Sequence, residues 1–241
     1  MFELIIKFFN IIKLIIQLHF LIKLKLNSNY LISPEITKFH KFSPKLKVAI
    51  LASGEGSNFL NLINLANNFE LDINIKVLIS NNQKAGCIKK AIDNNIPYSI
   101  INDKEFKNKD LFEQKIIKIL KSNEIELVVL AGWMKIISEG FVKSYKNKII
   151  NIHPSILPSF KGKNAIKDSL NEGVHLTGCS VHFVETEVDS GKLIIQGVLP
   201  IMPNDNEESL INKIHLLEHK ILPYGISEAG YFIRNPIKDK N

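Results

Sequence analysis

The fold is decided by residues 46–58, which spell Leu46-Lys47-Val48-Ala49-Ile50-Leu51-Ala52-Ser53-Gly54-Glu55-Gly56-Ser57-Asn58. The part from Lys47 to Ala52 is a short apolar run rich in β-forming residues, which predicts a buried parallel strand. Directly after the glycines, apolar positions with helical spacing predict a helix over 57–67. A strand, a glycine-rich turn and a helix in this order are typical of an α/β fold.

The same alternation continues along the chain. We predict further strands at 75–79, 98–101, 126–131 and 149–152, with helices over 85–94 and 109–121 between them. This order predicts a Rossmann-like, mostly parallel sheet with helices on both faces. The helix over 109–121 is expected to bury one apolar face, which comprises Leu111, Phe112, Ile116, Ile119 and Leu120.

The pattern changes after the last of these strands. Strands predicted at 177–185 and 192–200 flank the turn Asp189-Ser190-Gly191, which indicates a hairpin-like or mixed-sheet addition with antiparallel strands. A long C-terminal helix is predicted from about Glu207. It is expected to bury Leu210, Ile214, Leu217 and Ile221, and Pro223 is predicted to kink it or to end its first part.

Residues 1–45 form a predicted N-terminal extension, and 46–241 form the predicted enzyme domain. The apolar stretch 1–26 is interrupted by polar residues at three- to four-residue intervals, so its uncharged part is too short to span a bilayer. A membrane-surface helix and a dispensable leader that is absent from the mature protein both fit this pattern. A secretory signal fits less well, because no small-residue cleavage site follows. Residues 27–45 are predicted to be a linker.

Charge and cysteine content restrict the class of protein. The chain of 241 residues carries a net charge of +7, but seven lysines and two glutamates in residues 1–45 account for +5 of it. The domain is therefore nearly neutral, which argues against nucleic-acid binding. Two cysteines, Cys87 and Cys179, cannot form a disulfide framework, so we expect reduced thiols in the cytoplasm.

The loop Gly54-Glu55-Gly56-Ser57-Asn58 lies between the first strand and the first helix, where helix N–H groups face outward and attract anions. A dinucleotide site would require a third glycine at position 59, which is Phe59, and no Gly-Lys-Ser/Thr follows for a triphosphate. The loop therefore favours a monophosphate over NAD or ATP. A glycine-rich turn with a Ser/Asn helix cap and no ligand would have the same pattern.

Asn151 and His153 are separated by one residue near the end of a predicted parallel strand, so their side chains point to the same side. Parallel α/β folds place their sites at this end of the strands. An amide donor and an imidazole aimed at one point suit a carbonyl that becomes a tetrahedral oxyanion. Asp189, in a turn, could orient or charge such a histidine. A buried structural His153 and an ordinary turn residue at Asp189 remain alternatives. A metal site formed by His182, His153 and Asp189 is disfavoured, because no short-spaced ligand pair anchors it.

Residues 215–219 match the inverted zinc-peptidase pattern H-x-x-E-H. On a helix, His215 and His219 would share one face. The match is short and leaves little chain for another ligand, so we predict no metal.

Taken together, six segments resemble the folate-dependent formyltransferases of purine synthesis, the glycinamide ribonucleotide formyltransferase family. They are 52–58, 128–136, 151–162, 178–184, 187–191 and 217–219, in family order and over nearly all of the chain from 47 to about 231. The resemblance implies that Asn151, His153 and Asp189 are catalytic. It implies that the phosphorylated substrate contacts Gly56, Ser57, Asn58, His215 and Glu218. It assigns the folate to Lys109, Met134, Lys135, Ile136, Ile137, Asn151, Glu185, Thr186, Glu187, Val188 and Asp189.

Two positions depart from the family pattern. The family often has arginine where Lys109 and Lys135 stand, and lysine keeps the charge but loses bidentate geometry. The alignment of Lys109 also passes through a weakly matching stretch.

The resemblance implies transfer of the formyl group of 10-formyltetrahydrofolate to the amine of a phosphoribosylglycinamide, in de novo purine (IMP) biosynthesis. His153 would act protonated, with its pKa raised by Asp189. The implied partners are these small molecules alone, with no nucleic acid or membrane, and the protein would be a monomer or a weak homodimer. Another formyltetrahydrofolate-using transferase or hydrolase is the nearest alternative. The tRNA-specific transferase usually has a second domain and lacks the Gly-Ser-Asn loop, and the hydrolase has an N-terminal regulatory domain. A non-catalytic phosphate-binding module would not need Asn151 with His153.

Overall fold

The computed structural model describes residues 30–236. The expectations for 1–26 lie outside the described residues. The strands are β1 (Leu31–Ser33), β2 (Leu46–Leu51), β3 (Ile73–Ser80), β4 (Tyr98–Ile100), β5 (Leu127–Leu130), β6 (Ile149–His153), β7 (Leu176–Phe183) and β8 (Leu193–Pro200). The helices are α2 (Ser57–Asn67), α3 (Gly86–Asp93), η1 (Asp103–Glu105), α4 (Lys109–Ser122), α5 (Glu139–Ser144), α6 (Ala165–Asn171) and α7 (Glu207–Arg234).

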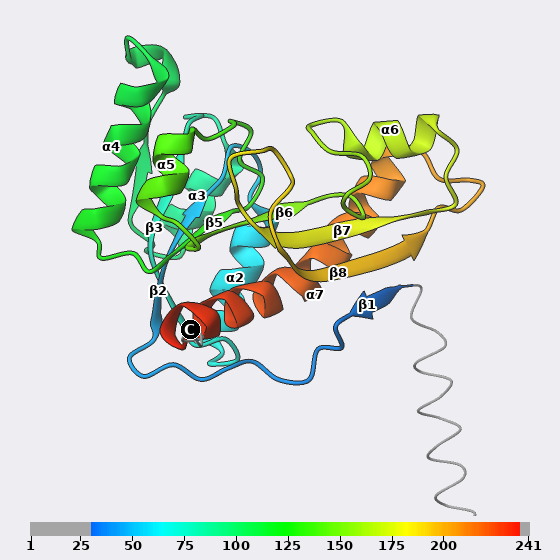
Figure 1. Ribbon diagram of the computed structural model, residues 1–241, viewed down its shortest axis with the longest axis horizontal. Helices are drawn as coiled ribbons and strands as arrows, with labels where there is room; N and C mark the ends of the chain where they lie inside the picture. Colours follow the sequence, from blue (N-terminus) through cyan, green and yellow to red (C-terminus); the bar gives the residue numbers. More distant parts are fainter. Residues whose placement is uncertain (1–29, 237–241) are drawn as a thin grey trace, which may run out of the picture. The chain divides into compact units, whose positions relative to one another are not determined.

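The strands form one sheet in the order β1-β8-β7-β6-β5-β2-β3-β4. Strands β2 to β6 pair in parallel, whereas β7 is antiparallel to both β6 and β8. The predicted mixed sheet is therefore confirmed. From β2 the chain builds outward to β4 and then returns to place β5 on the other side of β2, which makes a topological switch point between β2 and β5 (Figure 1). Ligands of open α/β sheets bind beyond the carboxyl ends of the strands at such a point.

Helices cover both faces of the sheet. On one face, side chains of α4 and α5 such as Phe112, Ile116 and Phe141 pack with Ala49 and Leu51 of β2 in one buried apolar cluster. On the other face, α7 contacts α2 and the strands β5 to β8. The predicted burial of α7 is confirmed for Leu210, Ile214, Leu217 and Ile221. The prediction was wrong for Leu111, which is exposed in the first turn of α4.

Helix α7 is continuous through Pro223, so the prediction that proline ends its first part is wrong. Proline has no N–H, and in a helix it leaves the carbonyl four residues earlier without its usual partner. That carbonyl belongs to His219, and the side-chain amide of Asn61 on α2 donates to it at 2.8 Å. The residues that follow Pro223 are buried, so packing against the sheet sustains the helix.

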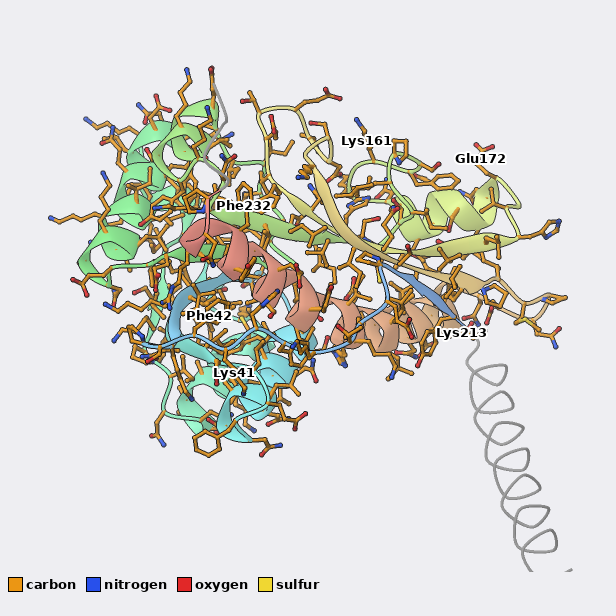
Figure 2. All side chains as sticks on the ribbon, turned by 60° about the horizontal axis from the view of Figure 1, so that its bottom comes forward. Lys41, Phe42, Lys161, Glu172, Lys213 and Phe232 are labelled. Carbon is orange, nitrogen blue, oxygen red and sulfur yellow. The ribbon has the colours of Figure 1, made fainter. Side chains whose placement is uncertain are left out.

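The segment 40–45, predicted to be part of a linker, packs against the enzyme domain. The His40 N–H donates to the Ser227 hydroxyl at 2.7 Å, and the His40 ring stacks on Tyr231. Phe42 is buried, and the Arg234 guanidinium lies 5.3 Å from the centre of its ring. Figure 2 labels Lys41 and Phe42 on this segment and Phe232 on the last turns of α7. The ordered contacts of the domain thus begin before the boundary predicted at residue 46.

Two short helices, α5 and α6, were not predicted, because six or seven residues carry too little periodicity to identify a helix. Among residues 30–236, no helix combines the length and the apolar character needed to cross a membrane.

Candidate active site

A cavity of about 620 Å³ opens at the carboxyl ends of β2, β5 and β6. Its wall is formed by the turn between β2 and α2, the segment after β5, the end of β6, the segment 162–167, the segment between β7 and β8, and one side of α7. All the predicted site residues line it except Lys109. The cavity therefore lies at the switch point of the sheet.

The turn before α2 is held close to α3. Gly56 is the N-cap of α2 and has φ of +73°, a conformation that favours glycine. A Cβ atom at this position would lie 2.5 Å from Cβ of Cys87, so no larger residue fits without displacement. No side chain caps α2, which leaves the N–H groups of its first turn for a ligand. Residues Gly54 to Asn58 all line the cavity.

Asn58 uses its side chain differently from the expectation that it would bind phosphate or cap the helix. Its Nδ2 donates to Oε2 of Glu218 on α7 at 2.7 Å, and its buried Oδ1 has no protein partner. Glu218 is only 5% exposed, and burial raises its pKa to about 7, against the lowering effect of the bond from Asn58. The α7 side of the cavity thus holds a carboxyl group whose charge changes near neutral pH.

The histidines beside Glu218 do not form the zinc-peptidase arrangement. His215 lines the cavity, and burial lowers its pKa. Burial also lowers the pKa of His219, and the positive charge of His215 lowers it further, but His219 does not line the cavity. Within residues 30–236 no group of three or more potential ligands could hold a metal ion.

The end of β6 carries the expected pair. Because β6 pairs with the antiparallel β7, Asn151 lies opposite His182 and His153 lies opposite Ser180. Asn151 Nδ2 lies 3.2 Å from His182 Nε2, and it donates to Oδ1 of Asp189 over 3.5 Å. His182 Nδ1 donates to the carbonyl of Phe183 at 2.8 Å, so its Nε2 is free to accept from Asn151. The amide of Asn151 is thus oriented by two partners.

His153 lies between two acceptors. Its Nε2 donates to the carbonyl of Phe160 at 2.8 Å, and its Nδ1 lies 3.4 Å from Oδ2 of Asp189. The same carboxylate oxygen accepts the N–H of Gly162 at 2.8 Å. Asp189 itself has φ of +51°, so its backbone is held in a strained conformation. The loop 160–162 therefore fixes both His153 and Asp189.

The pKa of His153 is lowered, whereas we expected from the sequence that Asp189 would raise it. Burial lowers it below its ordinary value, although the bond to Phe160 and the negative charge of Asp189 both raise it. Asp189 acts in the expected direction, but in the protein without ligand burial has the larger effect. For Asp189, burial opposes ionisation, yet the neighbouring His182 ring, the bond from the Gly162 N–H and the charge of His153 together lower its pKa. Asp189 therefore stays ionised at neutral pH.

The rim of the cavity is apolar and exposed on one side. Met134 is 70% exposed and Ile136 is 65% exposed, and Val188 of the segment 185–189 is exposed too. Lys135 lies between the first two, and its Nζ is 2.7 Å from Oδ2 of Asp103. Lys109 is the predicted site residue that does not line the cavity. It begins α4 outside the cavity, with Nζ 3.9 Å from Oε1 of Glu113.

Among the cavity residues that were not assigned to the site from the sequence are His182, Lys163 and Lys167. His182 was weighed only as a metal ligand, but its register opposite Asn151 makes it part of the polar network. The alternation of β7 could have revealed this, because His182 and Ser180 point to the same face. Lys163 and Lys167 line the cavity beside α6, and no sequence pattern marks them.

Comparison with known proteins places this site in a family. The family model described as formyl transferase matches residues 46–226, and all the residues that line the cavity lie within this range. The chain belongs to the formyl transferase family. Family members of known structure share its fold. A phosphoribosylglycinamide formyltransferase from Anaplasma phagocytophilum is 37% identical with a TM-score of 0.72, over 77% of this chain and 86% of that one. A glycinamide ribonucleotide transformylase 1 from Geobacillus kaustophilus is 35% identical with a TM-score of 0.74, over 76% and 98% of the two chains.

Curated relatives in the same family are longer proteins. The trifunctional purine biosynthetic protein adenosine-3 of Bos taurus is 42% identical over 179 residues, which are 74% of this chain and 18% of that protein. The chain spans less than a fifth of the length of this relative.

Proposed function

We propose that this protein transfers the formyl group of 10-formyltetrahydrofolate to the amine of a phosphoribosylglycinamide, a step of purine biosynthesis. One observation carries the proposal. An amide, an imidazole and a carboxylate converge at the end of β6, in a cavity that is also lined by an uncapped helix N-terminus. The names of the similar solved structures agree with it.

The ribonucleotide is held by its phosphate at Gly56 and Ser57. The N–H groups at the start of α2 face this point, and the positive end of the helix dipole favours a dianion there. Glu218 and His215 lie on the neighbouring side of the cavity, where they contact the rest of this substrate. Glu218 remains anchored by Asn58.

The folate occupies the opposite rim. Its flat rings lie against the exposed apolar side chains of Met134 and Ile136 and against the segment 185–189. This position brings the formyl carbon to Asn151 and His153 and leaves the glutamate tail at the mouth. No contact of Lys109 is needed.

The chemistry is direct transfer. The amine nitrogen of the ribonucleotide forms a bond to the formyl carbon, and the carbonyl oxygen becomes an oxyanion. Asn151 Nδ2 gives up its long contact with Asp189 to donate to this oxygen, and His153, protonated, donates from Nε2 in place of its bond to Phe160. The bond from carbon to folate N10 then breaks as the amine proton passes to N10. Holding both substrates in contact supplies much of the rate.

Asp189 makes this protonation possible in a buried site. Its carboxylate faces Nδ1 of His153 at 3.4 Å, and an imidazolium has a hydrogen on each ring nitrogen to satisfy both Asp189 and its second acceptor. The charge of Asp189 thus offsets the effect of burial at the moment when the oxyanion forms.

The test is a direct assay of the two substrates. Purified protein is incubated with 10-formyltetrahydrofolate and phosphoribosylglycinamide, and the formylated product and tetrahydrofolate are both quantified, with and without EDTA. We expect equal amounts of the two products and no effect of the chelator. Release of formate without formylated ribonucleotide would replace the proposal with a hydrolase, and loss of activity in EDTA would contradict the metal-free mechanism.

A further inference from the structure

The cation on the folate rim already has a carboxylate partner within the protein. Lys135 Nζ lies 2.7 Å from Oδ2 of Asp103, and the side chains of the two residues are 41% and 34% exposed. Lys135 lines the cavity, whereas Asp103 lies in η1 just outside it. The pair therefore joins the rim of the cavity to the segment before α4.

Asp103 remains ionised in this pair. The bond from Lys135 is the largest cause that lowers the pKa of its carboxyl group. The side chain of Asn102 accepts the N–H of Lys104 and caps the short helix, which holds the segment that carries Asp103. A negative charge is thus fixed beside the ammonium group at every pH near neutrality.

The substrate brings carboxylates to the same place. A reduced folate carries its formyl group at N10 and two carboxylates on its glutamate, at the far end of the molecule. With the formyl carbon at Asn151 and His153, the glutamate must leave the cavity at the rim. On the side of Met134 and Ile136 the cation that lines the cavity is Lys135, since Lys109 stands outside it and faces Glu113.

We propose that Asp103 is a specificity-determining residue that competes with the folate tail for Lys135 and so weakens the preference for an acidic tail. This inference rests on the proposed function. A tail carboxylate can bind Lys135 only by displacing Asp103 or by sharing the ammonium group with it, and in the second case the two carboxylates repel each other. Removal of the Asp103 charge then strengthens binding of an acidic tail and leaves a neutral tail unaffected.

The experiment compares Asp103→Asn with wild type on two ligands. One is tetrahydrofolate, and the other is its analogue with both tail carboxylates converted to carboxamides. Dissociation constants are measured by calorimetry, and the Michaelis constants of the corresponding 10-formyl compounds are measured in the transfer assay. We expect the variant to bind the acidic ligand about three- to fivefold more tightly, as one exposed ion pair allows. Binding of the carboxamide should change by less than about 1.5-fold, within the range of surface substitutions.

Two controls test whether the effect arises from the ion pair of Asp103 with Lys135. Glu139→Gln removes an exposed carboxylate that pairs with Lys143 at 2.6 Å away from the cavity, and it should change neither ligand's affinity. In a Lys135→Gln background, Asp103→Asn should lose its effect, because the shared cation is gone. Weaker binding of the acidic ligand by Asp103→Asn would instead make Asp103 a positioning residue for Lys135, and equal changes for both ligands would exclude competition at the tail.

The outcomes separate this inference from the proposed function. If the protein binds tetrahydrofolate but transfers no formyl group, the proposed reaction is wrong, while calorimetry still decides the role of Asp103. If it binds neither ligand, both proposals are overturned. If transfer proceeds and Asp103→Asn does not discriminate between the two tails, this inference alone fails.

Discussion

The floor and the rim of the cavity are built by different physical rules. On the floor, Asn151, His153 and Asp189 are short side chains held on paired strands and in a tight loop, and each has a polar partner within the protein. On the rim, Lys135 is a long side chain that lies close to an acidic residue of the protein itself, and Lys109, outside the cavity, does the same. Backbone register fixes the position of a short side chain, whereas a long one goes to the strongest partner within its reach. The floor should therefore respond sharply to substitution, and the rim only weakly.

The strongest test of this difference is His153→Ala. Loss of a proton donor at the reacting carbonyl should reduce kcat by about 10²- to 10⁴-fold. The fold should be retained, because His153 lies at the end of β6 and its hydrogen bond to Phe160 is local. Steady-state kinetics and a thermal unfolding curve provide the two measurements. Near-normal turnover with a normal melting curve would remove His153 from the mechanism.

The second prediction concerns the turn before α2. Gly56→Ala forces a Cβ atom into the space of Cys87 at a φ of +73°, and the combined strain and overpacking should lower the free energy of unfolding by about 2 to 5 kcal/mol. Gly54→Ala is the matched control, because a Cβ atom there meets nothing within 4 Å. Urea denaturation of both variants gives the comparison. Equal stability of the two would show that the turn is not held by the contact with α3.

The third prediction uses the buried carboxyl of Glu218, whose folded pKa is about 7 instead of 4.5. Below pH 4.5 the group is protonated in both states, and its favourable effect is complete. As the pH rises from 4.5 towards 7, the unfolded chain is ionised while Glu218 stays protonated in the folded protein, so stability falls by about 2 to 3 kcal/mol between pH 5 and pH 8. Glu218→Gln should lack this loss. Urea midpoints of both proteins at the two pH values measure it, and parallel pH profiles would mean that Glu218 is ionised in the folded state throughout.

The smallest effect is expected at Lys109. Its contact with the buried Glu113 is a single long pair at 3.9 Å, Glu113 also accepts from Ser138, and the Lys109 ammonium group does not line the cavity. Lys109→Gln should change the Michaelis constant of the folate by less than about twofold and stability by less than about 0.5 kcal/mol. Lys143→Gln, which breaks a similar pair on α5, is the control. A rise in the Michaelis constant of tenfold in the first variant alone would return Lys109 to the folate site.

The same contrast explains what could be predicted from the sequence. Period-two and helical spacing located the strands and long helices, and the order of elements predicted the parallel sheet and its switch point. Asn151 and His153 could be paired from their spacing alone, because alternate residues of a strand face the same side. His182 was underestimated because its role depends on the register of β7 against β6, which no local pattern records.

Other features depend on tertiary contacts that the sequence does not express locally. The continuity of α7 through Pro223 depends on a donor from Asn61, which lies on another helix. The pKa of His153 depends on the balance between burial and two acceptors, and burial could not be estimated from position in the chain. The ion pair of Lys135 depends on η1, a single turn too short for any periodicity.

The antiparallel pairing of β6 with β7 has a consequence for how the chain tolerates changes in length. The segment from 154 to 175 joins the two strands and carries α6, and its last part, 171–175, is largely exposed and does not line the cavity. Residues could be inserted there at modest cost in chain entropy, provided that the strands keep their alignment. A slip of one position would instead place Val181 or Phe183 opposite Asn151 and turn His182 to the other face. Variants of this loop should therefore divide into two groups with little between them, fully active proteins with the original alignment and inactive ones without it.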